Sequence, residues 1–320
     1  MKYVLPDLIK TILYFDIFAY PLSRDELFAY TGIDVENAEK AGEQLDYLVT
    51  KGVLSYSGGF YYMGNRGTPV ERRIQGNQRA QQRMKAARFY SVIISSFPFV
   101  ESVMLSGSIA KGYMGKNDDI DYFIVTKPGR LWLVRSMLVL FKKIFLRNSY
   151  RNFCLNYFVD SEHLQIKERN RFTATEIAFL VPVFNREIHT RMLAANSWIR
   201  EYYPNNVFDK GLGHEKKYFL TRLFEVLFDN SLGDMLDSYL FRLSTKIIGK
   251  KFGYMGREDF FRCFSIRRHE LRYLPNRQQQ RIMKRLCWKM KLFEQKTGVA
   301  LFSDMQRPKP KTGQSFAPVY

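Results

Sequence analysis

Hydrophobic residues form three short runs in the middle of the chain. Residues 103–105 and 120–125 flank a polar segment that holds Gly107-Ser108, and Phe153 to Val159 forms the third run. Short apolar runs bounded by turn residues predict buried strands. A longer amphipathic stretch, Arg130 to Phe145, follows Pro128-Gly129 and predicts a helix. The order strand, turn, strand, helix, strand predicts an α+β core with a small mixed sheet backed by helices.

The first 65 residues have the pattern of a winged helix. Apolar residues at helical spacing predict a helix from Leu5 to Ala19, and Ser23-Arg24-Asp25-Glu26 is a capping box that opens a second helix. Asp34 caps a third helix that runs to about Lys51. The runs 53–56 and 60–63, joined through Ser57-Gly58-Gly59, predict the hairpin of the wing.

The third helix of this N-terminal domain is acidic. It carries Asp34, Glu36, Glu39, Glu43 and Asp46 against Lys40 and Lys51. Winged helices often insert this helix into the major groove of DNA, but a negative helix repels phosphates. Packing or protein interaction is therefore favoured over direct DNA binding.

Helical patterns dominate the remainder of the chain. A long basic helix, Pro69 to Phe97, is predicted to connect the N-terminal domain to the sheet. After about Thr173 the predicted helices are Ala174–Val181, Arg186–Tyr203, Lys216–Phe228, Leu232–Ile248 and the basic Arg277–Lys291. We therefore expect a winged helix over 1–65, a linker helix and sheet core over 66–165, a C-terminal helical domain over 166–306 and a flexible tail over 307–320.

Two carboxylates two residues apart are the first candidate for chemistry. Asp119 and Asp121 lie beside Ile120, Phe123 and Val125, and in an extended strand such residues share a face about 6.6 Å apart. Buried carboxylates without a partner are costly. Mg²⁺ is commonly held by one or two carboxylates plus substrate phosphates. Asp119 and Asp121 are therefore the predicted metal ligands.

The turn before them supplies a candidate phosphate site. Gly107 permits close backbone approach, Ser108 offers a hydroxyl and a backbone N–H, and Lys111 adds positive charge. The segment contains no Walker motif, no Gly-x-Gly-x-x-Gly and no Gly-x-Ser-x-Gly elbow. The combination of the Gly-Ser turn with the two carboxylates points to magnesium-nucleotide chemistry.

Residues 103–125 resemble the signature of the DNA polymerase beta-like nucleotidyltransferase superfamily, and the order of elements extends the resemblance to about residue 160. The resemblance implies a nucleotidyltransferase core in which Gly107 and Ser108 hold the triphosphate of an NTP such as ATP and Asp119 and Asp121 bind Mg²⁺. The implied reaction transfers a nucleoside monophosphate to an acceptor hydroxyl and releases pyrophosphate.

Members of the superfamily usually add a third carboxylate on the next strand, and this chain departs from that pattern. Asn156 occupies the expected position. An amide oxygen can ligate a hard cation, but an amide cannot act as a general base. Asp160 shares the parity of Asn156 at about 13 Å along the strand, and Glu162 and Glu176 are further alternatives.

Charge is concentrated toward the C-terminus. The chain has a net charge of +19, and residues 241–320 hold 19 Lys and Arg against 5 Asp and Glu. A basic end of this size predicts a polyanionic partner, such as nucleic acid, an acidic surface or a phosphate-rich substrate. A solvated basic face is the alternative.

Other compositional features narrow the class of protein. The three cysteines and four histidines have neither a disulfide nor a metal-binding spacing. No uninterrupted apolar run reaches about 18 residues, so no membrane span is expected, and the first 20 residues lack a signal-peptide pattern. A cytoplasmic protein is the resulting expectation.

Three functional hypotheses follow. The first is a Mg²⁺-dependent nucleotidyltransferase with an unidentified acceptor. The second is a degenerate nucleotide-binding regulator or scaffold, because the third acid is missing. The third is a nucleic-acid-binding regulator that uses the basic C-terminal region, with binding that falls steeply with salt.

Overall fold

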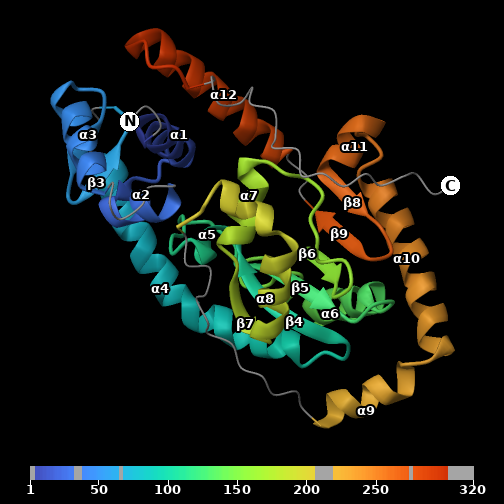
Figure 1. Ribbon diagram of the computed structural model, residues 1–320. Coiled ribbons are helices and arrows are strands. Elements are labelled where there is room, and N and C mark those ends of the chain that lie inside the picture. The colour runs from blue at the N-terminus through green and yellow to red at the C-terminus, as the bar shows by residue number, and fades with distance from the viewer. Residues whose placement is uncertain (1–3, 32–37, 65–67, 206–218, 274–276, 302–320) are drawn as a thin grey trace.

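The computed structural model describes residues 4–31, 38–64, 68–205, 219–273 and 277–301. It is a mixed α+β structure with two sheets (Figure 1). None of its described helices is long and apolar enough to cross a membrane.

In its described residues, the N-terminal module has three helices and a small antiparallel sheet in the order β1-β3-β2. Its elements are α1 (Val4–Asp16), β1 (Leu22–Ser23), α2 (Arg24–Tyr30), α3 (Ala38–Thr50), β2 (Ser55–Ser57) and β3 (Phe60–Tyr62). The predicted capping box is confirmed: the Glu26 amide donates to Ser23 Oγ, and the Ser23 amide donates to Glu26 Oε2. The predicted start of the third helix, at Asp34, lies outside the described residues.

Helix α4 (Thr68–Ser95) confirms the predicted linker helix and connects the module to the main sheet (Figure 1). At its N-terminal end Arg73 donates to Glu26 Oε1 at 2.6 Å and lies over the Tyr20 ring at 3.6 Å. Further along, Tyr122 of the sheet donates to the Ala87 carbonyl. The helix is therefore anchored to both parts of the molecule.

The main sheet has six strands in the order β7-β4-β5-β6-β9-β8. The strands are β4 (Val100–Ser106), β5 (Asp121–Thr126), β6 (Cys154–Asp160), β7 (Val181–Phe184), β8 (Phe264–Ile266) and β9 (Glu270–Tyr273). Only the β5–β6 pair is parallel among the described pairs. Helix α6 (Leu131–Phe145) supplies the crossover that a parallel pair requires.

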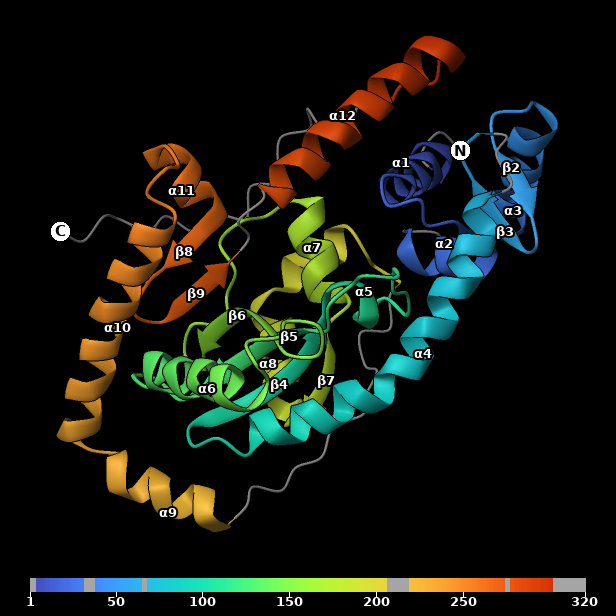
Figure 2. The same cartoon turned by 180° about the vertical axis from the view of Figure 1, so that it is seen from behind.

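Alternating side chains of the sheet enter two separate hydrophobic cores. Met104, Phe123 and Val159 pack with α1, α7 (Arg171–Ala178), α8 (Arg186–Ala195) and α12 (Gln278–Thr297). Their neighbours Val103 and Tyr122 point to the opposite face, where α4, α6, α10 (Ser231–Lys251) and α11 (Arg257–Cys263) lie. This is the two-residue period of a sheet covered by helices on both faces, and Figure 2 shows these layers from behind.

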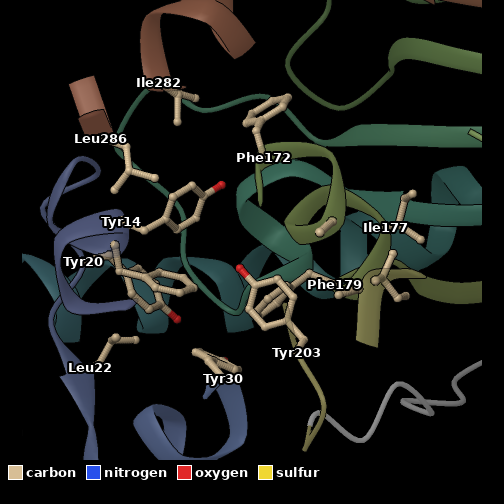
Figure 3. Packing of buried hydrophobic residues seen from close by; sticks show 14 of the residues in the cluster. Tyr14, Tyr20, Leu22, Tyr30, Phe172, Ile177, Phe179, Tyr203, Ile282 and Leu286 are labelled. Carbon is tan, nitrogen blue, oxygen red and sulfur yellow. The ribbon is translucent and has the colours of Figure 1, made fainter. Parts of the chain in front are cut away.

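The N-terminal module shares a core with the body of the protein. Phe179, just after α7, lies with its ring centroid 5.0 Å from Tyr30 and 6.3 Å from Phe15. Figure 3 shows Tyr14, Tyr20 and Tyr30 of the module facing Phe172, Phe179 and Tyr203. The module is therefore packed onto the body rather than tethered to it.

Two predictions for the C-terminal half are wrong. The helix expected over 174–181 ends at Ala178, and Val181 begins β7, because Pro182 cannot continue a helix and the run Val-Pro-Val-Phe pairs with β4. The helix expected over 186–203 ends at Ala195 and resumes as a 3₁₀ turn (Ser197–Glu201). The Asn196 side chain breaks it by bonding the backbone of Leu164 and Ile166.

The remaining C-terminal predictions hold where the structure describes them. Helix α9 (Phe219–Phe228) and helix α10 cover most of two predicted helices, and α12 extends the predicted basic helix to Thr297. The strands β8 and β9 were not expected in this mostly helical region, and they extend the main sheet. The predicted tail, 307–320, lies outside the described residues.

Candidate functional site

The candidate site lies where β4 turns into β5. Strand β4 ends at Ser106, a single helical turn, α5 (Gly107–Ala110), follows, and the chain returns to β5 at Asp121. Gly107 has φ +67°, and a Cβ built on it would lie 2.3 Å from Asp121 Oδ2. A side chain at position 107 would therefore displace the carboxylate, so glycine is required both by the backbone and by the close approach.

The two predicted metal ligands line the same cavity, but they do not share a strand. Asp121 is the first residue of β5, whereas Asp119 precedes the strand in the loop. The expectation that both carboxylates project from one extended strand is therefore corrected. Their convergence comes from the loop, which is held by Gly115 donating to Asp118 at 2.8 Å and by Ile120 donating to the Arg151 carbonyl.

Asn156 lies against Asp121, as its place on the neighbouring parallel strand requires. Its Nδ2 donates to Asp121 Oδ1 at 2.5 Å, and its Oδ1 accepts from the Cys154 thiol at 3.2 Å. The amide therefore occupies one carboxylate oxygen of the predicted metal ligand. Burial raises the pKa of the Cys154 thiol well above its usual range, so Cys154 stays protonated as a donor.

Burial raises the pKa of Asp121 to about 7, and the nearby carboxylates of Glu176 and Asp119 act in the same direction. The Lys111 ammonium opposes this shift weakly. The charged form of a partly buried carboxylate near other acids is strongly stabilised by a cation.

The predicted phosphate-binding residues line the cavity, with one difference. Ser108 lies within α5, and the carbonyl of Ser108 accepts from the Lys111 and Tyr113 amides. Lys111 is not a free cation: its ammonium donates to Glu176 Oε1 at 2.9 Å and to the Gly107 carbonyl at 3.1 Å. Lys111 therefore ties α7 to the glycine turn.

The structure separates the alternatives for a third carboxylate. Asp160 is buried at the far end of β6, where it accepts hydrogen bonds from His163 Nδ1 and from the Glu162 amide. Neither Asp160 nor Glu162 lines the cavity. Glu176 of α7 does line it. Of the acids considered from the sequence, Glu176 is the one brought to Asp119 and Asp121.

The cavity has a volume of about 790 Å³, within the range of small-molecule sites. One wall comes from the N-terminal module through Tyr14, Phe15, Phe18 and Tyr20. On the sheet, the rings of Phe123 and Tyr157 stack with centroids 4.5 Å apart. The site therefore combines an acidic end with an aromatic wall.

The cavity lining also includes a paired cation. Arg272 of β9 donates to Glu168 Oε1 at 2.8 Å, with a second bond from Nη1 to Oε2. Tyr157 donates to Glu270 Oε1 at 2.6 Å from the neighbouring strand. These bonds fix the orientation of Arg272 and Tyr157 in the cavity wall.

The donor set partly fits a metal ion. Asp119 makes no hydrogen bond or ion pair with another described residue. Asp121 is a carboxylate whose charged form a nearby cation would stabilise. Among the described residues, however, no group of three or more His, Cys, Asp or Glu is arranged to hold a metal. Two carboxylates with room beside them fit Mg²⁺ only when substrate phosphates complete the shell.

Several residues of this site carry no sequence pattern that would reveal them. Tyr14 and Phe18, Arg272, and Gln278 and Gln279 line the cavity from segments about 100 or more residues from the glycine turn. Comparison of the chain with protein-family models, with curated proteins and with solved structures finds no match.

Proposed function

We propose that the protein is a Mg²⁺-dependent nucleotidyltransferase that transfers a nucleoside monophosphate from an NTP to an acceptor hydroxyl. One observation carries the proposal: Asp119 and Asp121 line one cavity with the Gly107-Ser108 turn and with Glu176. Carboxylates beside a turn that permits close backbone approach are what a metal-bound triphosphate needs.

The order of elements supports the same class. β4, α5, β5, α6 and β6 follow the strand, turn, strand, helix, strand order that the superfamily resemblance implies. The N-terminal module has the element order α1-β1-α2-α3-β2-β3, as in a winged helix. Its acidic helix α3 favours packing over DNA binding.

The proposed roles follow from the contacts. Asp119 and Asp121 would hold Mg²⁺, which would neutralise the phosphates and the charge that develops on the pyrophosphate. Gly107 and Ser108 would receive the triphosphate. Glu176 would accept the proton of the acceptor hydroxyl, a role that the Asn156 amide cannot fill.

The aromatic wall supports an acceptor or nucleobase bound by stacking. Phe18 is 41% exposed and lines the side of the cavity formed by the N-terminal module, together with the nearly buried Phe15 and Tyr20. Base–aromatic stacking contributes roughly 1 to 3 kcal/mol and tolerates every base. The N-terminal module would therefore act as part of the substrate site.

The test is label transfer from each of the four NTPs labelled at the α-phosphate, with Mg²⁺ and a panel of small hydroxyl acceptors. We expect pyrophosphate release by the full chain and none by Asp119→Asn/Asp121→Asn. Asp25→Asn/Asp46→Asn, in the N-terminal module, is the matched control. If the site variant retains the activity of the unmodified chain, the proposed site is wrong.

A second candidate, nucleotide binding without turnover, is favoured by the Asn156 contact with Asp121. In that case NTP binding would require Mg²⁺ and be lost in Asp119→Asn/Asp121→Asn, while pyrophosphate release stays absent for every acceptor. Isothermal titration with a non-hydrolysable NTP analogue, beside the label assay, separates the two functions.

A further inference from the structure

Helices α9 and α10 form the edge of the molecule opposite the N-terminal module, in both Figure 1 and Figure 2. Large apolar side chains cover the outer side of α10: Leu232, Met235, Tyr239, Leu243 and Ile247 are all exposed. They are spaced three or four residues apart, so they form one row along the helix. Gly233, Asp237, Ser244 and Ile248 lie on the buried side.

Helix α9, which directly precedes α10 in the chain, also carries exposed apolar residues. Leu223, Phe224, Val226 and Leu227 are exposed, with Val226 at 74% and Leu227 at 58%. We call the exposed apolar residues of α9 and α10 together the outer face. Apolar residues in a contiguous exposed patch of this kind usually mark a binding surface.

Four of the five cations of the same two helices are exposed without an ion pair among the described residues, and the fifth, Lys251, lies over the Phe252 ring at 5.4 Å. Arg222, Arg242, Lys246 and Lys250 are exposed, and none forms an ion pair with another described residue. Arg242 and Lys246 lie three and seven residues after Tyr239 of the apolar row, which is the spacing of one helix face. Positive charge and apolar surface therefore lie on the same side of α10.

The acids of α9 and α10 are bound to the body of the protein instead. Glu225 accepts from the Phe99 amide at 2.7 Å, and Asp229 accepts from Lys127 at 2.5 Å. Asp234 accepts from Arg130 at 2.5 Å, and the buried Asp237 accepts from the Trp132 and Leu133 amides at 2.8 Å each. The three acids of these helices, and Asp229 between them, thus contact residues 99–133, which leaves a positive outer face.

We propose that the outer face docks onto an anionic lipid surface, with α9 and α10 lying in the plane of the interface. Apolar side chains flanked by Lys and Arg are the combination by which helices bind such surfaces without spanning them. The apolar row would enter the region between headgroups and acyl chains, and the four cations would contact the anionic headgroups.

Charge argues against the other occupants of this surface. A second copy docked through the same face would oppose two positive surfaces, and the chain carries +19 overall. A nucleic acid would satisfy the cations but would leave the aliphatic row, with Leu232, Leu243 and Ile247, in contact with phosphate and water. A lipid surface satisfies both properties at once.

The test is flotation of the full chain with vesicles of phosphatidylcholine alone and of phosphatidylcholine mixed with phosphatidylglycerol. We expect binding to the anionic vesicles that weakens as salt rises, and little binding to the neutral ones. Arg242→Gln/Lys246→Gln/Lys250→Gln is expected to weaken binding by roughly 100-fold, on the basis of its three lost charges. Met235→Glu/Leu243→Glu is expected to abolish it.

Helix α12 offers matched controls. Arg281→Gln/Lys284→Gln/Arg285→Gln removes the same charge from exposed positions, and Trp288→Glu places an acid at a residue that is 60% exposed. Both controls are expected to bind vesicles at least half as tightly as the unmodified chain. Circular dichroism and thermal melts confirm that every variant is folded.

Three results would overturn the proposal. The first is that the chain binds neutral and anionic vesicles equally, or binds neither. The second is that the α12 controls lose as much vesicle binding as the variants of α10. The third is a monomer–dimer equilibrium, or binding to RNA, that Met235→Glu/Leu243→Glu disrupts while vesicle binding persists. The third result would assign the outer face to a second copy or to a nucleic acid.

Discussion

Gly107 and Asp121 lie so close that a Cβ at position 107 would approach Asp121 Oδ2 to 2.3 Å and displace the carboxylate. The contact joins the end of β4 to the start of β5 and so couples the proposed phosphate turn to a proposed metal ligand. Gly112, a few residues on, also has a left-handed backbone, with φ +70°, but it has no atom within 4 Å of a built Cβ. A substitution at Gly112 therefore reports backbone strain alone, whereas the same substitution at Gly107 reports backbone strain together with contact with the Asp121 carboxylate.

For Gly107→Ala we expect loss of Mg²⁺-dependent nucleotide binding together with reduced stability. For Gly112→Ala we expect only the cost of the left-handed backbone, about 1 to 2 kcal/mol. Titration calorimetry with NTP and chemical denaturation measure the two effects. Nucleotide binding by Gly107→Ala that matches binding by Gly112→Ala would contradict the coupling.

Glu176→Gln tests the proposed general base. We expect kcat to fall roughly 10² to 10⁴-fold with a smaller change in the KM for NTP, because the proton acceptor is lost while both aspartates remain. Glu187→Gln, at an exposed position on α8, is the control, and an equal effect there would remove the assignment.

Asn156→Asp introduces the carboxylate that the superfamily pattern expects. Without metal we expect a lower melting temperature, because a third acid is placed beside Asp121, whose pKa burial already raises to about 7. Mg²⁺ with NTP should then raise the melting temperature more than it does in the unmodified chain. Differential scanning calorimetry with and without EDTA measures both values.

Asn152→Asp is the matched control for that experiment. The Asn152 Oδ1 accepts from Arg83 at 2.8 Å, outside the cavity. A carboxylate at position 152 gains Arg83 as a cationic partner. The melting temperature of Asn152→Asp should therefore not depend on metal. An Asn156→Asp variant that shows no larger metal response than Asn152→Asp would argue against a metal at this end of the site.

His189 is expected to make stability depend on pH. It is 2% exposed on α8, and burial, aided by Arg186, lowers its pKa to about 4. The unfolded chain, with a pKa near 6.5, takes up the proton first. The contribution of the neutral imidazole is therefore fully present above about pH 6.5 and lost as the pH falls toward 4, by on the order of 3 kcal/mol.

Urea denaturation of the unmodified chain and of His189→Gln between pH 4 and pH 7.5 measures the contribution of His189 to the free energy of unfolding. The difference in free energy of unfolding between the two proteins should shrink as the pH falls. His163→Gln, in which an exposed histidine is removed, is the control. A constant difference across the range would show that His189 is not the group responsible.

Phe179→Ala tests whether the N-terminal module unfolds with the body. Phe179 is 1% exposed and contacts the rings of Phe15, Tyr30 and Tyr203. We expect a loss of about 3 to 5 kcal/mol in one cooperative transition. Phe261→Ala, at a residue 62% exposed, should change stability by about 0.5 kcal/mol or less. Two separate transitions would instead show a module that folds alone.

Local patterns in the sequence were sufficient for the N-terminal helices, the capping box at Ser23, the linker helix and the strands β4 to β6. Each depends on residues near one another in the chain: a cap three residues from its partner, or an apolar run bounded by turns. The positions of Gly107, Ser108, Asp121 and Asn156 at one site followed from the same local order. Asp119 lines the same cavity, but it does not lie on the strand as the sequence predicted, because the strand begins only at Asp121.

Only the tertiary structure decided which distant residues complete the site. Glu176 reaches the carboxylates because α7 packs over the sheet, and Lys111 is occupied because that packing gives it a partner. The aromatic wall exists because Phe179 and its neighbours bury the N-terminal module against the body. β7, β8 and β9 are three or four residues long, so their pairing partners, and not their own periodicity, make them strands.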